Sequence, residues 1–388
     1  MSAELAGAIL DACRKVLPAH RPLALHEPVL GDAEQRLVEE CLRSGWVSTA
    51  GPYVERFESE LCAVTGACHA IAVVNGTAAL HAALLVAGVR AGDEVLVPTL
   101  TFVATANAVA YCGAIPHFVD ASAKTLGVEA QALDRYLSEH AMHSGAATLN
   151  RTTQRPLRAL VVMHTFGHPA DMDALRALAD RWRLVLIEDA AESLGSTYQG
   201  KHTGTIGAIG TLSFNGNKIV TTGGGGAILI NDDVLAKRAR HLCTTARVSA
   251  GWNFVHDEIG YNYRLPSLNA ALGLAQLEQL PRLLAAKRAL AHRYAEVFAT
   301  VPGVRFFKPE SMDTSNHWLN TLILDESNAG AREQILACLN ADGLYARPAW
   351  TPMHRLPMYQ DCPRMPLPVA DTLARCIVNL PSSPALVA

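Results

Sequence analysis

The sequence predicts an α/β protein with a largely parallel β-sheet, and two features carry this prediction. Short apolar runs recur along residues 37–255, and longer stretches with helical spacing separate them. Continuous apolar runs, unlike alternating ones, are typical of strands that are covered on both faces. Helical stretches between such strands are typical of the crossovers that parallel strands require.

Five apolar runs are the predicted strands of this sheet: residues 70–74, 94–97, 160–163, 184–187 and 227–230. Three intervening stretches have the spacing of helices: residues 78–86, 104–112 and 172–183. The segment 144–155 contains Gly, Ala, Thr and Arg, and we predict that it forms an exposed loop.

The pattern changes after Pro266. Two long helices rich in Ala and Leu are predicted first, at residues 268–284 and 286–301. Candidate strands at 304–307 and 319–324 follow, and then candidate helices at 331–342 and 369–378. This order is typical of a small α+β unit. We therefore predict a large domain that, with an N-terminal segment, occupies residues 1–265, and a small C-terminal domain at 266–388.

Composition excludes several classes of protein. The 388 residues include 33 Lys+Arg and 36 Asp+Glu, 50% are hydrophobic, and no basic run is present. A nucleic-acid binder would need a basic patch, and a disordered chain would have fewer apolar residues. The nine cysteines form no CxxC pair, so we expect buried apolar side chains and predict no metal site. We find neither a signal peptide nor a membrane span, and we expect a cytoplasmic protein that does not bind membranes.

A turn of small residues follows the first predicted strand. Residues 75–80 read Asn-Gly-Thr-Ala-Ala-Leu and open a predicted helix. Backbone N–H groups at a helix start suit a phosphate, and the hydroxyl of Thr77 would lie beside them. The alternative is an ordinary helix cap at Asn75.

Two ionisable residues lie beyond later strands. Asp189 follows the strand at 184–187, where it would suit a pyridinium nitrogen or, alternatively, cap a helix. Lys218 lies among small, apolar and uncharged polar residues, where a lysine can form a Schiff base; a solvated loop lysine is the alternative. Ser213 could bind a phosphate, and the glycines at 223–226 would allow a tight turn beside a ligand. Together with the turn at 75–80, these residues match the needs of pyridoxal phosphate (PLP).

These motifs identify a family resemblance that runs nearly the whole length of the chain. The chain resembles the DegT/DnrJ/StrS family of PLP-dependent sugar aminotransferases. The matching blocks, in family order, are residues 51–58, 75–80, 98–104, 188–191, 213–218, 260–264 and 380–381. The resemblance implies the fold-type I architecture, in which the large domain has a mostly parallel, seven-stranded sheet.

The resemblance also implies roles for individual residues. Lys218 would carry the cofactor and move the proton, and Asp189 would face the pyridine nitrogen. The cofactor-binding positions would be Gly76, Thr77, Phe102, Asp189, Glu192, Ser213, Lys218 and Asn262. Phe102 would pack on the face of the cofactor, and Asn262 would reach the phosphate of a neighbouring subunit. This last position implies a homodimer with composite active sites.

The activity implied is transfer of an amino group from L-glutamate to a keto-sugar, expected to be nucleotide-linked, for a cell-surface polysaccharide or glycan. Residues 214–226 and 346–350 look closest to the branch for bacillosamine, legionaminic-type or related sugars. Glu192 departs from the Gln or His that the family often has near the cofactor's 3′-oxygen. A carboxylate there would repel that oxygen unless it is protonated or turned away. Two alternatives remain: a dehydratase or lyase of the same fold, in which His often replaces Lys218, and a non-catalytic regulator.

Other polar residues have weaker signals. Candidate substrate contacts are Trp46, Ser48, Thr49, Arg347 and His354. His164 and His168 are four apart, but Gly167 and Pro169 preclude a helix between them, so we expect structural roles and not a metal pair. Asp171 is expected to cap the helix that follows it.

Overall fold

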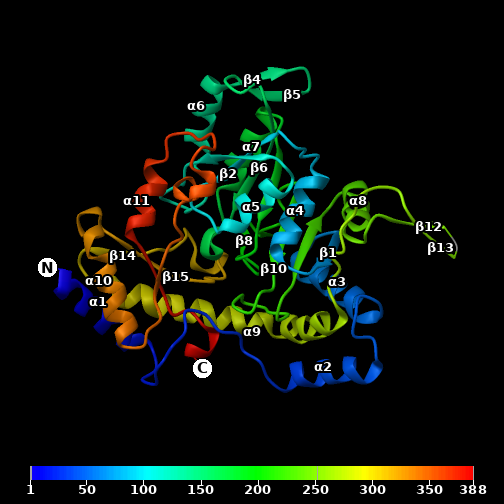
Figure 1. The fold of residues 1–388 in the computed structure, drawn as a ribbon. Coiled ribbons are helices and arrows are strands. Elements are labelled where there is room, and N and C mark those ends of the chain that lie inside the picture. Colours follow the sequence, from blue (N-terminus) through cyan, green and yellow to red (C-terminus); the bar gives the residue numbers. More distant parts are fainter. Residues whose placement is uncertain (1, 251, 388) are drawn as a thin grey trace.

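The computed structural model describes residues 2–250 and 252–387, and its largest element is a mixed β-sheet (Figure 1). The strands along the sheet, in spatial order, are β1 (His69–Val73), β11 (Gly226–Ile230), β10 (Ile209–Ser213), β7 (Val185–Asp189), β6 (Pro156–Met163), β2 (Glu94–Pro98) and β3 (Ile115–Val119). Of these seven strands, β11 runs in the direction opposite to the other six. The expected mostly parallel sheet is therefore confirmed, but it has nine strands and not seven, because β4 (Ala141–Ser144) and β5 (Ala147–Asn150) also belong to it.

Three parts of this sheet differ from the sequence prediction. The segment 144–155 is not a loop throughout, because β4 and β5 form a hairpin that pairs with β6. Strands β3 and β10 were not predicted. β3 reads Ile-Pro-His-Phe-Val and β10 reads Ile-Gly-Thr-Leu-Ser, so neither has a continuous apolar run. These two segments form strands because burial between neighbouring strands stabilises them, although their own sequences predict a strand only weakly.

Helices cover the sheet, and alternate residues of its strands belong to different cores. Ile71 packs in the core with α4 (Gly76–Val86), α5 (Val103–Tyr111), α6 (Ala130–His140), α7 (Met172–Arg181) and α8 (Asp233–Cys243). Ala70 and Ala72 pack in a second core with α2 (Asp32–Ser44), α3 (Pro52–Thr65) and the first half of α9 (Ser267–Phe298). Asp171 caps α7, as predicted, because its carboxylate accepts the N–H of Ala174 at 3.3 Å.

The two predicted long helices are one helix. α9 runs from Ser267 to Phe298 without a break and contains Pro281. The division predicted at residue 285 was wrong because no helix-breaking residue lies there. The helix contacts α2 and α3 along its first half and α1 (Ser2–Val16) farther on, so tertiary packing holds its whole length in one rod (Figure 1).

The small C-terminal unit is built on a four-stranded antiparallel sheet. Its strands, in spatial order, are β14 (Val304–Phe306), β15 (Asn320–Leu324), β17 (Ile377–Leu380) and β16 (Arg347–Pro348). Helices α10 (Arg332–Ala341) and α11 (Pro368–Cys376) pack against it, so the helix predicted at 369–378 ends two residues early and leads into β17. Ile9 and Cys13 of α1 belong to the same core. We therefore propose that α1 belongs to the C-terminal unit, although it lies within residues 1–265.

Short elements complete the chain. They are β8 (Thr197–Tyr198), β9 (Lys201–His202), β12 (Arg247–Ala250), β13 (Asn253–His256) and the 3₁₀ helices η1 (Thr165–Gly167), η2 (Met312–Thr314), η3 (Glu326–Ala331), η4 (Met353–Arg355), η5 (Pro357–Tyr359) and η6 (Pro384–Val387). The β12–β13 hairpin projects away from the body of the molecule (Figure 1).

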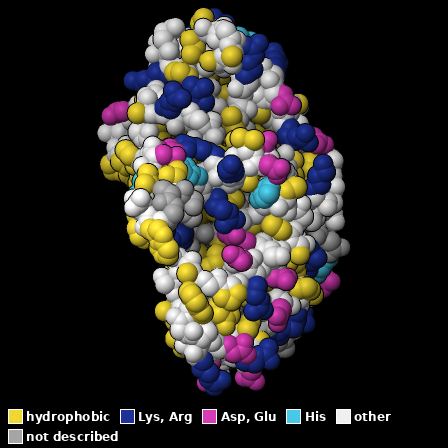
Figure 2. Space-filling model, turned by 90° about the vertical axis from the view of Figure 1, so that its right-hand side faces the viewer, with side chains coloured by type: hydrophobic (Ala, Val, Ile, Leu, Met, Phe, Trp, Pro, Cys, Tyr) yellow, Lys and Arg dark blue, Asp and Glu magenta, His cyan; other side chains and the backbone are white. Residues whose placement is uncertain are grey.

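The surface carries charges of both signs. On the face drawn in Figure 2, basic and acidic side chains are interspersed, which fits the balanced composition. Within residues 2–250 and 252–387, none of the helices combines the length and hydropathy that a bilayer span requires. The expected cytoplasmic location stays a prediction.

Candidate active site

A cavity of about 300 Å³ lies where β7 and β10 end and α4 begins. Parallel α/β sheets commonly bind ligands at this edge, beyond the carboxyl ends of their strands. The predicted residues that line it are Gly76, Thr77, Phe102, Asp189, Glu192, Ser213 and Lys218. The fold therefore brings together seven of the eight predicted cofactor-binding positions.

Lys218 reaches the cavity from the turn after β10. Its side chain is 13% exposed, and its Nζ lies 3.4 Å from Oε1 of Glu192 and 3.9 Å from the ring centre of Trp318. The Trp318 indole N–H donates to the carbonyl of Asn217 at 2.8 Å, which fixes the ring beside the lysine. The alternative of a freely solvated loop lysine is therefore wrong.

Asp189 lies at the end of β7 and is 3% exposed. Its Oδ2 accepts the hydroxyl of Thr105 at 2.8 Å, and its Oδ1 accepts the N–H of Ala191 at 3.2 Å. Burial raises the pKa of this carboxyl above its ordinary value, against the effect of the two hydrogen bonds and of Lys218. A turn follows Asp189, so the alternative of a helix cap is wrong.

The turn at the start of α4 combines a helix cap with a close approach of three segments. Oδ1 of Asn75 caps the helix by accepting the N–H of Ala78 at 2.8 Å. A Cβ atom on Gly76 would lie 2.9 Å from Cβ of Ser213, so only glycine lets the start of α4 approach the end of β10 this closely. Thr77 and Ser213 both line the cavity beside the helix start, where N–H groups favour an anion.

Gly226 of β11 offers a test of this close approach. A Cβ atom there would lie 2.6 Å from the carbonyl of Asn75, so G226A should displace the start of α4. We expect a loss of about 1–3 kcal/mol of unfolding free energy and weaker phosphate binding, measured by denaturant unfolding and by titration with PLP. G224A is the matched control, because a Cβ on Gly224 meets nothing within 4 Å. Equal behaviour of the two variants would contradict the tight packing.

Glu192 is the second carboxyl in the cavity. Its Oε2 accepts the N–H of Phe166 at 2.9 Å, and its Oε1 faces Lys218. Burial raises the pKa of Glu192 to about 7, although the positive charge of Lys218 and the N–H of Phe166 act in the opposite direction. The group is therefore divided between its acid and carboxylate forms near neutral pH.

The remaining predicted residues lie elsewhere. Asn262 is exposed, and its Oδ1 accepts from Arg264 in its own chain. The five candidate substrate contacts, Trp46, Ser48, Thr49, Arg347 and His354, are absent from the described residues that line the cavity. His354 lies 2.8 Å from the hydroxyl of Thr99 and 3.4 Å from Asp371, and Arg347 is exposed in β16. These substrate assignments stay predictions.

Sequence reasoning missed two residues of the cavity wall, Met163 and Trp318, and one residue behind it, Thr105. Thr105 holds Asp189, Met163 lines the cavity, and Trp318 covers Lys218. Thr105 lies close to the matching block at 98–104, so its position beside the block was the available signal. Trp318 has no local signal, because it lies 100 positions from Lys218 and only the fold brings the two together.

His164 has the structural role that we predicted. Its Nε2 lies 2.9 Å from Glu188, and its Nδ1 accepts the N–H of Ala170 at 3.1 Å. Glu188 also accepts backbone N–H groups from Gly204, Ile206 and Gly207. The pair therefore ties the loop after β6 to the segment before β10.

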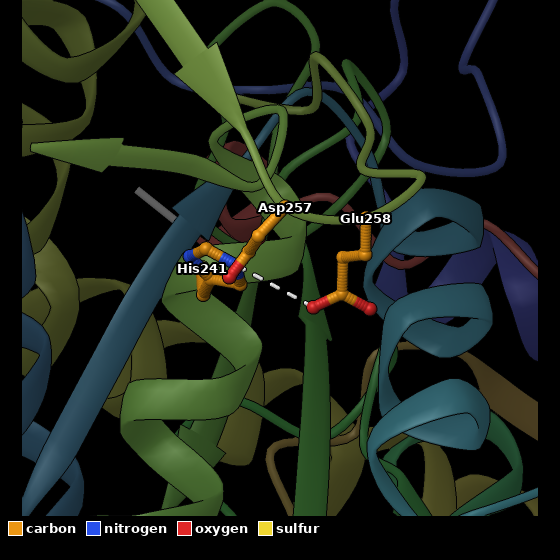
Figure 3. Close-up of side chains that lie close together, drawn as sticks. All are labelled: His241, Asp257 and Glu258. Atoms are coloured by element: carbon orange, nitrogen blue, oxygen red, sulfur yellow. Dashed lines mark hydrogen bonds and ion pairs between the residues drawn. The ribbon is translucent and has the colours of Figure 1, made fainter. Parts of the chain in front are cut away.

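A second cluster of ionisable side chains lies away from the cavity, at the base of the β12–β13 hairpin (Figure 3). Nε2 of His241 is 2.7 Å from Asp257 and 3.4 Å from Glu258. Both oxygens of Glu258 also accept from Arg238, whose charge already balances that of the carboxylate. The cluster is therefore an ion-pair network between α8 and the hairpin.

Comparisons with known proteins agree with this geometry. The model of the DegT/DnrJ/EryC1/StrS aminotransferase family matches residues 28–388. GDP-perosamine synthase of Vibrio cholerae is 35% identical over 365 residues, which cover 94% of this chain and 95% of that protein. GDP-perosamine synthase of Escherichia coli O157:H7 is 37% identical over 364 residues and 94% of each chain. The crystal structure of the aminotransferase TlmJ from Streptoalloteichus hindustanus superposes with a TM-score of 0.84, at 30% identity and 94% coverage of both chains.

Proposed function

The chain belongs to the DegT/DnrJ/EryC1/StrS aminotransferase family, and from that premise we propose that it transfers the amino group of L-glutamate to a nucleotide-linked keto-sugar. It is a PLP-dependent aminotransferase. One observation supports this cavity as the site of the reaction: Lys218, Asp189 and the start of α4 line the same space of about 300 Å³.

The residues present fit PLP. Gly76 lets the start of α4 pack directly against Ser213, and Thr77 and Ser213 both line the cavity there, where their hydroxyls would hold the phosphate. Asp189 would hold the ring nitrogen, Lys218 the aldehyde end, and Phe102 one face of the ring. The bound cofactor supplies a cationic ring that withdraws electrons from the substrate carbon next to the amine.

The side chains around the cavity have separate roles in the proposed reaction. Asp189 keeps a negative charge buried at the floor of the cavity, where Thr105 and the N–H of Ala191 fix its direction. Lys218 takes up and returns a proton at Nζ. Trp318 and Trp350 form apolar walls that limit the access of water.

The sugar substrate is inferred from the relatives. Two of them are named for GDP-perosamine, and these names support a nucleotide-linked sugar. The keto group of the substrate and a role in cell-surface glycans stay part of the proposal. The finer branch, for bacillosamine or legionaminic-type sugars, stays a proposal. We also propose a homodimer, because Asn262 lies outside its own chain's cavity, near a hairpin that exposes Trp252 and Phe254.

Product analysis tests this function. The PLP-loaded enzyme, given L-glutamate and a panel of GDP-, UDP- and TDP-linked keto-sugars, should release 2-oxoglutarate and an amino sugar in equal amounts by mass spectrometry. Loss of water from the sugar without 2-oxoglutarate would indicate a dehydratase instead. If borohydride reduction followed by peptide mapping left Lys218 unmodified, the assignment of the cofactor lysine would be wrong.

A further inference from the structure

Glu192 and Lys218 form a buried pair whose geometry suits proton transfer. Oε1 of Glu192 and Nζ of Lys218 are 3.4 Å apart, and the two side chains are 2% and 13% exposed. The other oxygen, Oε2, is held by the N–H of Phe166 at 2.9 Å, so Oε1 is left facing the lysine. The amide of Asn316 donates to the backbone carbonyl of Glu192 at 2.9 Å and fixes the turn.

Three groups bear on the charge of Glu192. Lys218 and the N–H of Phe166 favour the carboxylate, and Asp189 disfavours it. Oδ2 of Asp189 accepts from Thr105, and Trp318 faces Nζ with its ring. Transfer of a proton from the Lys218 ammonium to the Glu192 carboxylate removes both charges, so burial of the two side chains lowers the free-energy cost of the transfer relative to water.

We propose that Glu192 accepts the excess proton of the Lys218 ammonium and so supplies Lys218 as a free amine. An N–H bond of Nζ breaks, its electron pair stays on nitrogen as the lone pair, and an O–H bond forms at Oε1. The reverse step returns the proton. This inference rests on the proposed function, because the free amine is the form of Lys218 that can bind the cofactor's aldehyde and accept a substrate proton.

Two further observations support the assignment. The pKa of Glu192, raised by burial to about 7, makes its carboxyl able to hold or release a proton near neutral pH. Trp318 keeps Nζ close to Oε1, because its ring lies 3.9 Å from the nitrogen and its peptide N–H is held by Asn316 at 2.8 Å.

The uptake of PLP by the apoenzyme tests the proposal without any substrate. The rate constant, followed by absorbance between pH 5.5 and 9, should rise in the wild type with an inflection near pH 7 that belongs to the pair. In E192Q the amide keeps the shape of the side chain but cannot take the proton. We expect the inflection to move up by about one pH unit or more, and the rate constant at pH 7 to fall about tenfold.

The matched control is E94Q, which also removes a buried carboxyl. Glu94 lies at the start of β2 and is paired with His117, away from the cavity. Its burial would raise the pKa, but hydrogen bonds from His117, Thr153 and Asn150 outweigh burial and lower it, so it does not titrate in this pH range. E94Q should therefore keep the wild-type profile. A folded E192Q whose profile superimposes on that of the wild type would overturn the proposal.

A second measurement needs no variant. Infrared difference spectra of the wild-type apoenzyme, from pH 5.5 to 8.5, should show Glu192 changing from the acid to the carboxylate with a midpoint near pH 7, because only the carboxylate can then accept a proton from Lys218. Absence of such a change would overturn the proposal even if E192Q did not fold. Neither measurement uses glutamate or a sugar, so a wrong substrate assignment would leave both results valid. Failure of the wild type to take up PLP would instead contradict the proposed function.

Discussion

Replacing Lys218 with alanine should reduce amino transfer on the order of 10⁴-fold, because one side chain is proposed both to bind the cofactor and to move the proton. The fold should survive, since Lys218 lies in a turn and its Nζ contacts only Glu192 and Trp318 among the described interactions. Single-turnover rates with glutamate measure the loss. The absorbance band that the lysine-bound cofactor gives near the visible edge should disappear with it.

Comparison with two other lysines shows whether the loss of activity is specific to Lys218. Lys201 is exposed in β9, so K201A is the control that should keep full activity. Lys287 is also buried, and burial lowers its pKa, but its Nζ donates to the carbonyls of Trp318 and Ser382 and does not line the cavity. Full transamination by K218A would mean that the central assignment is wrong.

The second large effect is expected for D189N. Asparagine keeps the size of the side chain and can still accept the hydroxyl of Thr105, but it carries no charge to hold the cofactor's ring nitrogen in its protonated form. Removing a preorganised charge from a buried site commonly costs about 10²–10³-fold in rate. We expect a fall of that size in kcat, with a smaller change in the KM for glutamate.

The variant T105V distinguishes the effect of the Asp189 charge from the effect of the hydrogen bond that orients its carboxylate. This variant removes the 2.8 Å hydrogen bond to Oδ2 and leaves the carboxylate in place, so its kcat should fall by about tenfold or less. If D189N fell no further than T105V, the negative charge would have no special role. The spectrum of the bound cofactor as a function of pH gives an independent readout.

Much of the fold could be predicted from short segments of the sequence. The apolar runs at 70–74 and 227–230 were sufficient to predict β1 and β11, because strands buried on both faces need continuous hydrophobic sequence. β3 and β10 were missed, since Pro116, His117 and Gly210 interrupt their patterns. The helix predicted at 268–284 correctly ran through Pro281, but the continuity of α9 at residue 285 was missed, although no helix-breaking residue lies there. Its two halves pack against different helices, and that contact pattern is set by the tertiary structure.

The candidate site was likewise predicted only in part from the sequence. Motifs near strand ends predicted Asp189 and Lys218, because parallel strands bring their carboxyl ends to one edge. The position of Glu192 in the cavity was predicted, but its partner was not. The sequence alone suggested repulsion of a cofactor oxygen, whereas the structure places the carboxyl 3.4 Å from Lys218.

By itself, the sequence determined the α/β class and the family, and it predicted Asp189 and Lys218 as the acid and the lysine of the site, since each depends on residues within short segments. Tertiary structure alone decided that α1 packs with the C-terminal unit, that Trp318 covers Lys218, and that Glu192 lies in a low-dielectric space beside a cation. These are contacts between segments up to hundreds of residues apart. Their energies depend on burial and distance, and no local pattern encodes either.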